Sequence, residues 1–217
     1  MTANITANIT HKYLENNLKG NTHFKNGEYE HALNEYECVI KGNHEDQVLR
    51  VKALNNAIIS HIHLFTKTSP KQSSNEQVYE YETKAVTRFF IMNEFTTKLM
   101  DYGHQLLKIY PKEGVSAKII KRSITRITNI CKELFLIQKE QREMLVEPDY
   151  EYVIRLLNFQ CVLLQKIKLD QKFRKMELDI AKSMIFYINK AAETKRPIAN
   201  QLRFETLQNI QKIFNKQ

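Results

Sequence analysis

The chain has 217 residues, of which 42% are hydrophobic and 26% are charged, so it has enough apolar residues for a continuous core. No apolar run reaches the roughly 18 residues that a membrane-spanning helix needs, so the sequence predicts no membrane span. The net charge is +9, and only eight of the 33 basic and seven of the 24 acidic residues lie in residues 1–75. The positive excess after residue 75 favours an anionic partner: an acidic peptide, a nucleic acid or an anionic membrane surface.

The first ten residues lack the basic start and apolar core of a secretion signal, and they lack the arginines of a mitochondrial presequence. We expect residues 1–10 to form a short disordered tail. Cys38, Cys131 and Cys161 are odd in number and widely spaced, which is typical of buried thiols in a reducing compartment rather than of a disulfide framework. These features predict a cytoplasmic or nuclear protein.

Residues 18–40, LKGNTHFKNGEYEHALNEYECVI, carry the most informative pattern in the chain. The spacing of their apolar and small residues predicts two helices that meet at a turn at Asn26-Gly27. Gly20 leaves room for a neighbouring helix to approach closely, and Ala32 is the small residue at the crossing point. Tyr36 and Val39 extend the same face of the second helix.

The order G-N-x-x-F-x-x-G-x-Y-x-x-A-x-x-x-Y-x-x-V, which starts at Gly20, resembles a tetratricopeptide repeat. In that family, paired helices of about 34 residues stack into a solenoid. The resemblance implies an all-α solenoid of helical hairpins that binds other proteins without catalysis. One clear repeat covers about a sixth of the chain, so a helical hairpin in an unrelated α-bundle is the alternative fold.

The rest of the chain is also predicted to be helical, with connections where helical patterns lapse, at Pro70, Pro111, Pro148 and Pro197. Residues 47–67 resume a helical pattern. A polar, serine-containing loop and an extra segment at 78–90 follow, so an insertion at about 68–92 lengthens the second repeat. The run from Met92 to Pro111 then resembles the second helix of that repeat.

A long helix ending near Val146 is predicted next, with an apolar face at Ile120, Ile124, Ile127, Cys131 and Leu134. Asp149 can cap a helix that runs to about Leu169. The face of a further helix is marked by Phe173, Met176, Ile180, Met184 and Ile188.

A last amphipathic helix is expected to cover the open end of the stack with Phe204, Leu207, Ile210 and Phe214. The predicted organisation is therefore a tail over 1–10, tetratricopeptide-like repeats over 11–146, and a C-terminal helical extension, degenerate repeat and cap over 147–217.

In one branch of the tetratricopeptide family, asparagines, lysines and an arginine on the concave face clamp the terminal carboxylate and aspartate of a chaperone tail. The resemblance places peptide-binding roles on Asn21, Asn55, Lys118 and Arg122. Charge-assisted hydrogen bonds from such groups contribute about 1.5–3 kcal/mol each. The clamp's first lysine falls on the uncharged Asn17, so the match is incomplete. The implied partner is a protein with an acidic or C-terminal segment, such as a heat-shock chaperone.

Other interpretations use the same residues. Lys118 and Arg122 are equally compatible with an ordinary solvated helix face, and Asn21 with a residue that bridges helices within the repeat. An assembly scaffold would instead bind an internal segment of a dedicated partner, with the insertion supplying specificity. A nucleic-acid-binding protein is less favoured because acidic residues are interspersed and no stacking series of aromatic residues accompanies the cations.

An enzymatic role is not expected. His61 and His63 are two residues apart and so point to opposite sides of a helix rather than to one metal. There is no phosphate loop, nucleophile elbow, HExxH or paired-cysteine pattern. We therefore predict no catalytic residue, no metal site and no cofactor.

Overall fold

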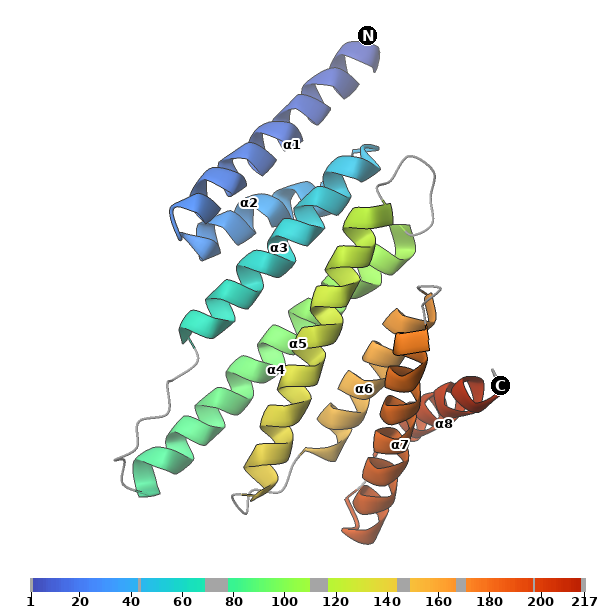
Figure 1. Cartoon of the computed structure of the whole chain (residues 1–217). Helices are drawn as coiled ribbons and strands as arrows, with labels where there is room; N and C mark the ends of the chain where they lie inside the picture. Colours follow the sequence, from blue (N-terminus) through green and yellow to red (C-terminus); the bar gives the residue numbers. More distant parts are fainter. Residues whose placement is uncertain are drawn as a thin grey trace. The chain divides into compact units, whose positions relative to one another are not determined.

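A computed structural model describes residues 2–42, 44–68, 78–109, 117–143, 149–166, 171–196 and 198–215. Helix is the only regular secondary structure in these ranges, which confirms the all-α prediction (Figure 1). The helices are α1 (Thr2–Lys25), α2 (Tyr29–Lys41), α3 (Gln47–Thr68), α4 (Val78–Ile109), α5 (Ala117–Glu143), α6 (Tyr150–Lys166), α7 (Gln171–Glu193) and α8 (Asn200–Phe214). The chain divides into two compact units, unit 1 (Met1–Ile124) and unit 2 (Thr125–Gln217), and the boundary falls within α5.

The predicted hairpin of α1 and α2 is present, with its turn at Asn26-Gly27. Gly27 has a φ of 77°, a conformation that glycine adopts without steric cost. Its amide donates to Phe24 O at 3.0 Å, and the Glu28 amide donates to His23 O at 2.9 Å, which closes the end of α1. α1 begins at Thr2, so the helix includes most of the residues for which a tail was expected. No glycine or proline interrupts the sequence before residue 20.

The crossing of α1 and α2 depends on small residues, as predicted. A Cβ at Gly20 would lie 2.6 Å from the ring of Tyr36, so only glycine lets the two helices approach this closely. Ala32 and Val39 are fully buried on α2, and Tyr36 is 1% exposed. These contacts confirm the hairpin that the spacing of residues 18–40 indicates.

The second pair of helices differs from the expected one in α4. The predicted bounds of α3 agree with the structure, but residues 78–90 are not a separate segment. They are the first half of one 32-residue helix, and residues 69–77 of the expected insertion lie outside the described residues. No proline or glycine occurs between residues 78 and 102 to end the helix. One buried face then continues through Met92, Phe95, Leu99 and Leu106.

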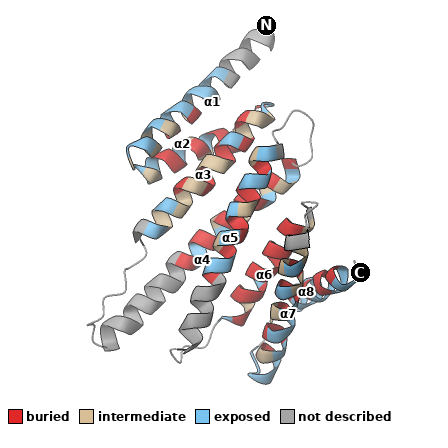
Figure 2. Ribbon diagram, viewed as in Figure 1, coloured by how far each residue is buried: buried red, intermediate tan, exposed pale blue. Residues whose placement is uncertain are grey.

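Unit 2 is built around α6, which is buried along nearly its whole length (Figure 2). α6 packs against α7 and α8, and Gln160 Nε2 of α6 donates to Thr128 O of α5 at 3.0 Å. Asp149 caps α6 as predicted, because its Oδ1 accepts a hydrogen bond from the Tyr152 amide at 3.0 Å. The predicted apolar face of α5 is buried throughout, at Ile120, Ile124, Ile127, Cys131 and Leu134.

On α7, Ile180, Met184 and Ile188 are buried as predicted, and Met176 is half-buried. The side chain of Phe173 lies outside the described residues.

The face predicted for α8 is wrong. Phe204, Leu207 and Phe214 are exposed, and of the predicted face only Ile210 is buried. The buried side of α8 instead comprises Leu202, Thr206, Asn209, Ile210 and Ile213. Two of these are polar residues, and both have hydrogen-bond partners in Asn158: its Nδ2 donates to Thr206 Oγ1 at 2.6 Å, and its Oδ1 accepts from Asn209 Nδ2 at 3.1 Å. Satisfied polar groups can be buried, so apolar spacing misidentified the face.

No helix of the described ranges combines the length and hydropathy needed to cross a bilayer.

Candidate functional site

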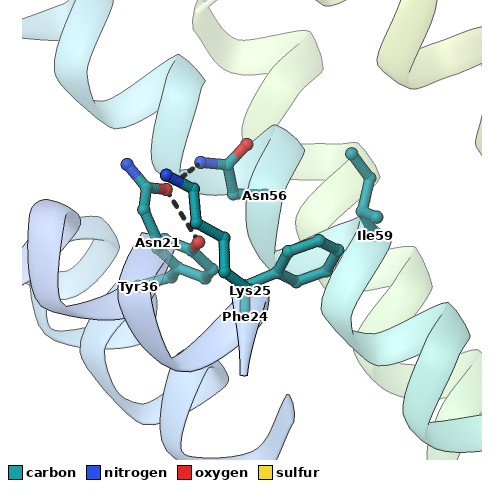
Figure 3. Close-up of a pocket in the computed structure, with 6 residues that line it drawn as sticks. All are labelled: Asn21, Phe24, Lys25, Tyr36, Asn56 and Ile59. Atoms are coloured by element: carbon teal, nitrogen blue, oxygen red, sulfur yellow. Dashed lines mark hydrogen bonds between the residues drawn. The ribbon is translucent and has the colours of Figure 1, made fainter. Parts of the chain in front are cut away.

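A side-chain amide in unit 1 joins three helices. Asn21 Oδ1 on α1 accepts a hydrogen bond from the Tyr36 hydroxyl of α2 at 2.9 Å and another from Asn56 Nδ2 of α3 at 3.0 Å. Burial raises the pKa of Tyr36, so its hydroxyl stays protonated and donates at neutral pH. Because both neighbours are donors, the amide has one orientation, and Asn21 Nδ2 lies on the side away from them (Figure 3).

The chain of hydrogen bonds continues through α3 to α5. Asn55 Nδ2 donates to Asn56 Oδ1 at 3.1 Å, and the buried Ser123 hydroxyl donates to Asn55 Oδ1 at 3.0 Å. We call this set of five residues, Tyr36, Asn21, Asn56, Asn55 and Ser123, the amide ladder. The ladder connects α1, α2, α3 and the start of α5, and all five members belong to unit 1.

A pocket of about 200 Å³ opens beside the amide ladder (Figure 3). Its polar lining comes from Asn21, Asn56 and Tyr36, and the rest of the lining is Phe24, Lys25 and Ile59. Phe24 is held by ring contacts to Tyr29 and His63, with centroid distances of 5.4 and 5.5 Å. The pocket therefore combines an apolar wall with an amide edge, a lining that can take an apolar group and hydrogen-bond a polar one.

Exposed cations lie on α1, α3 and α5, three of the four helices that the amide ladder connects. Lys25 borders the pocket, and Lys52 is exposed one turn before Asn56 on α3. Lys118 and Arg122 are exposed one turn apart on α5. These three helices therefore carry exposed cations, of which Lys25 lines the pocket.

Acidic residues are nearly absent from the same helices. α3 has none, α5 has none before Glu133, and the single acidic residue of α1, Glu15, pairs with Lys19 at 2.8 Å. By contrast, α2 carries three glutamates and one lysine, and α4 has equal numbers of acidic and basic residues. The charge of unit 1 is thus sorted by helix, with α1, α3 and the start of α5 basic.

The structure brings together two of the four predicted binding residues. Asn21 and Asn55 are connected through Asn56, whereas Lys118 and Arg122 form no hydrogen bond to an asparagine within the described ranges. Arg122 is next in sequence to Ser123, the last member of the amide ladder.

The position of the missing clamp lysine is occupied by Asn17, whose side chain is buried. Asn17 is only 7% exposed, and its Oδ1 has no hydrogen-bond partner in the part of the chain that is described. Because asparagine is uncharged, this position supplies no cation, and the carboxylate clamp that the resemblance implies lacks its first lysine here.

A separate ionic cluster joins α2 to α4 around Glu37. Its carboxylate accepts hydrogen bonds from Lys41, from Lys98 Nζ at 3.1 Å and from the Tyr102 hydroxyl at 2.9 Å. Burial by itself would raise the pKa of Glu37, but the three hydrogen bonds outweigh it and lower the pKa to about 2. Burial next to this carboxylate raises the pKa of Tyr102, which keeps the hydroxyl a donor. The glutamate of this cluster is satisfied by its neighbours and serves packing.

Among the described residues, no group of three or more His, Cys, Asp or Glu side chains lies close enough together to hold a metal ion. His61 stacks on Phe95 of α4, while His63 stacks on Tyr29 of α2, so the two point to different neighbours as predicted. Burial lowers the pKa of His61, which favours the neutral ring. Cys131 and Cys161 are buried as predicted, but Cys38 is exposed, because it lies off the buried side of α2.

Sequence reasoning missed Asn56, Ser123 and Lys25. Asn56 lies about 100° further around α3 than Asn55, and only the packing of α1 on α3 shows that this direction faces Asn21. Ser123 occupied a predicted apolar face and carried no signal of its own. Lys25, four residues after Asn21, could have been found from the same helical phase.

No protein-family model, curated protein or solved structure matches the chain. Its function is therefore inferred from the side chains and surfaces described above.

Proposed function

We propose that the protein is a non-catalytic adaptor that binds an acidic segment of another protein on the face formed by α1, α3 and the start of α5. The observation that carries this proposal is the sorting of charge in unit 1. Lys25, Lys52 and Arg122 are exposed on α1, α3 and α5, and acidic residues are almost absent from α1, α3 and the start of α5. Such a face attracts a partner of opposite charge and repels basic ones.

A tetratricopeptide-like arrangement is proposed as the scaffold of this face. α1 packs on α2, α2 on α3 and α3 on α4, while α1 also contacts α3 directly. In a solenoid of helical hairpins, the first helices of successive hairpins adjoin along one face, which is how α1, α3 and α5 are connected by the amide ladder. A face of this kind is rigid and needs little ordering when it binds a partner.

The proposal has two versions, which differ in the segment that is bound. In the first, the adaptor serves a heat-shock chaperone and receives an acidic C-terminal tail, with Asn21, Asn55, Lys118 and Arg122 in the roles that the family resemblance implies. In the second, the protein is an assembly scaffold that binds an internal segment of a dedicated partner. The buried Asn17 weakens the first version, because it removes one cation from the clamp.

Selection from a displayed peptide library tests the proposal. The library holds random peptides of about 16 residues, enough for a helix of some four turns, displayed with blocked and with free C-termini. We expect acidic sequences to be enriched and to compete for one surface. Their affinity should fall as salt is raised, because the contacts are electrostatic. Enrichment of neutral sequences, or of none, would contradict the proposal.

A synthetic peptide that ends in Glu-Glu-Val-Asp separates the two versions. The chaperone version predicts binding that is lost when the terminal carboxylate is amidated, and the scaffold version predicts no such dependence. A nucleic-acid-binding role would instead appear as nonspecific RNA or DNA binding with a steep salt dependence, stronger than binding to any acidic peptide.

A further inference from the structure

Two leucines are exposed on α1 in line with the pocket. Leu14 is 45% exposed and Leu18 is 56% exposed. Together with Asn21 and Lys25 they occupy positions i, i+4, i+7 and i+11, which lie on one side of a helix. α1 therefore presents a stripe that is apolar at its first half and reaches the pocket and a cation at its second half. We call these four residues the α1 stripe.

We propose that the segment bound on this face is an internal amphipathic helix with an apolar side and an acidic end, rather than an extended C-terminal tail. This inference rests on the proposed function and specifies the class of its ligand. The apolar side of the ligand helix covers Leu14 and Leu18 and places a bulky apolar side chain in the pocket beside Phe24. Its acidic end lies against Lys25, which borders the pocket.

The hydrogen bonding of the amide ladder argues for a helix. An extended peptide needs side-chain donors and acceptors on the receiving face to replace the water that its backbone loses. Here the carbonyl oxygens of Asn21, Asn55 and Asn56 already accept hydrogen bonds from other members of the amide ladder, and Asn21 Nδ2 is a single donor at the pocket, too few for the backbone of an extended segment. The backbone N–H and C=O groups of a helical ligand are hydrogen-bonded within the helix. Such a ligand therefore needs only apolar contacts and complementary charge from its receptor, and this face provides both.

The dimensions and charges of the α1 stripe agree with that ligand. From Leu14 to Lys25 is 11 residues, which at the helical rise spans about 16 Å, close to three turns of a ligand helix lying alongside. Leucines one turn apart provide the ridge that a second helix packs against. The charge is complementary too, since Lys25 is exposed at the pocket end of the stripe and the only acidic residue of α1 is paired with Lys19.

Binding measurements on the full chain with the library-selected peptides test this inference. We expect their sequences to repeat apolar residues at helical spacing, with acidic residues toward one end. Leu18→Ser should weaken binding at least tenfold, and a proline in the middle of the peptide should abolish it. Leu207→Ser is the matched control, because Leu207 on α8 is 51% exposed and belongs to unit 2. That variant should bind like the wild type.

The outcomes separate this inference from the proposed function. If acidic peptides are selected but lack apolar periodicity, tolerate the central proline and bind Leu18→Ser normally, the helical ligand is refuted and acidic-segment binding stands. If the selected peptides require a free C-terminal carboxylate, the chaperone-tail version replaces the helical one. If no acidic peptide is selected, the proposed function itself fails, and the inference with it.

Discussion

Each unit contains a hydrogen-bonded cluster centred on an asparagine, and the two clusters differ in whether they are complete. In unit 2, Asn158 donates to Thr206 and accepts from Asn209, and all three side chains are at most 8% exposed. In unit 1, Asn21 accepts two hydrogen bonds, but its Nδ2 lies away from both donors at the edge of a pocket. A closed cluster specifies packing, whereas an open one leaves a donor for a ligand.

The largest expected effect comes from opening the closed cluster. Asn158→Leu should leave the buried Asn209 Nδ2 without its acceptor and take one donor from Thr206, whose hydroxyl still donates to Leu202 O, and it should destabilise unit 2 by about 2–3 kcal/mol. Urea unfolding followed by circular dichroism measures the change. Adding Thr206→Val to Asn158→Leu should recover part of the loss, since both ends of one hydrogen bond are then apolar. A single variant as stable as the wild type would show that the cluster does not hold α8.

The next largest effect is expected where α1 packs on α2, at Gly20 and Tyr36 next to the open cluster. Gly20→Ala places a Cβ 2.6 Å from the Tyr36 ring and forces the α1–α2 crossing apart, at a cost of about 1–3 kcal/mol. Thr22→Ala, at an exposed position of the same helix, should be neutral or slightly stabilising. Thermal unfolding of the two variants compares them. Equal stabilities would mean that the crossing is not close packed.

A smaller effect, and one that depends on pH, is expected at Glu37. Its folded pKa of about 2 is below the ordinary value of 4.5, so its stabilising contribution is present above pH 4.5 and is lost as the pH falls toward 2. Glu37→Gln should lower stability at pH 7 by about 1 kcal/mol, a value reduced for solvent screening. The difference between variant and wild type should shrink on acidification, whereas the neutral asparagine clusters show no such change. A constant difference from pH 7 to pH 2 would contradict the ionic assignment.

The smallest expected effect on stability comes from the open cluster itself. Asn21→Ala should cost only about 0.5–1 kcal/mol, because water can replace the lost amide at a half-buried site. The same variant should weaken binding of the selected peptides through the loss of the pocket edge. Urea unfolding and fluorescence anisotropy measure the two quantities. A stability loss as large as that of Asn158→Leu, with unchanged binding, would reverse the distinction between the clusters.

The sequence predicted the parts of the fold that follow from backbone and apolar spacing. Three small residues determine the hairpin. Gly20 has no room for a Cβ beside Tyr36, Gly27 has a positive φ that glycine adopts without steric cost, and Ala32 is fully buried where the helices cross. The buried side of α8 was predicted wrongly because Thr206 and Asn209 are polar residues whose burial depends on Asn158, about 50 residues away. Pairing over such distances leaves no local pattern.

The sequence also predicted only part of the candidate site. The motif located Asn21 and Asn55, but their connection through Asn56 needed the relative rotation of α1 and α3. The exposure of Leu14 and Leu18 was also hidden, because leucines at helical spacing usually indicate a buried face.

The central claim is that the cations on α1, α3 and α5 bind an acidic segment, and removing them beside a control variant that loses the same number of cations elsewhere tests it most directly. The variant Lys25→Ala/Lys52→Ala/Arg122→Ala is compared with Lys108→Ala/Lys182→Ala/Lys212→Ala, whose lysines are exposed on α4, α7 and α8. Anisotropy titration with a selected acidic peptide should show binding about tenfold weaker or more in the first variant, from several contacts of up to about 1 kcal/mol each. The second should bind like the wild type. Equal affinities for both variants would contradict the account.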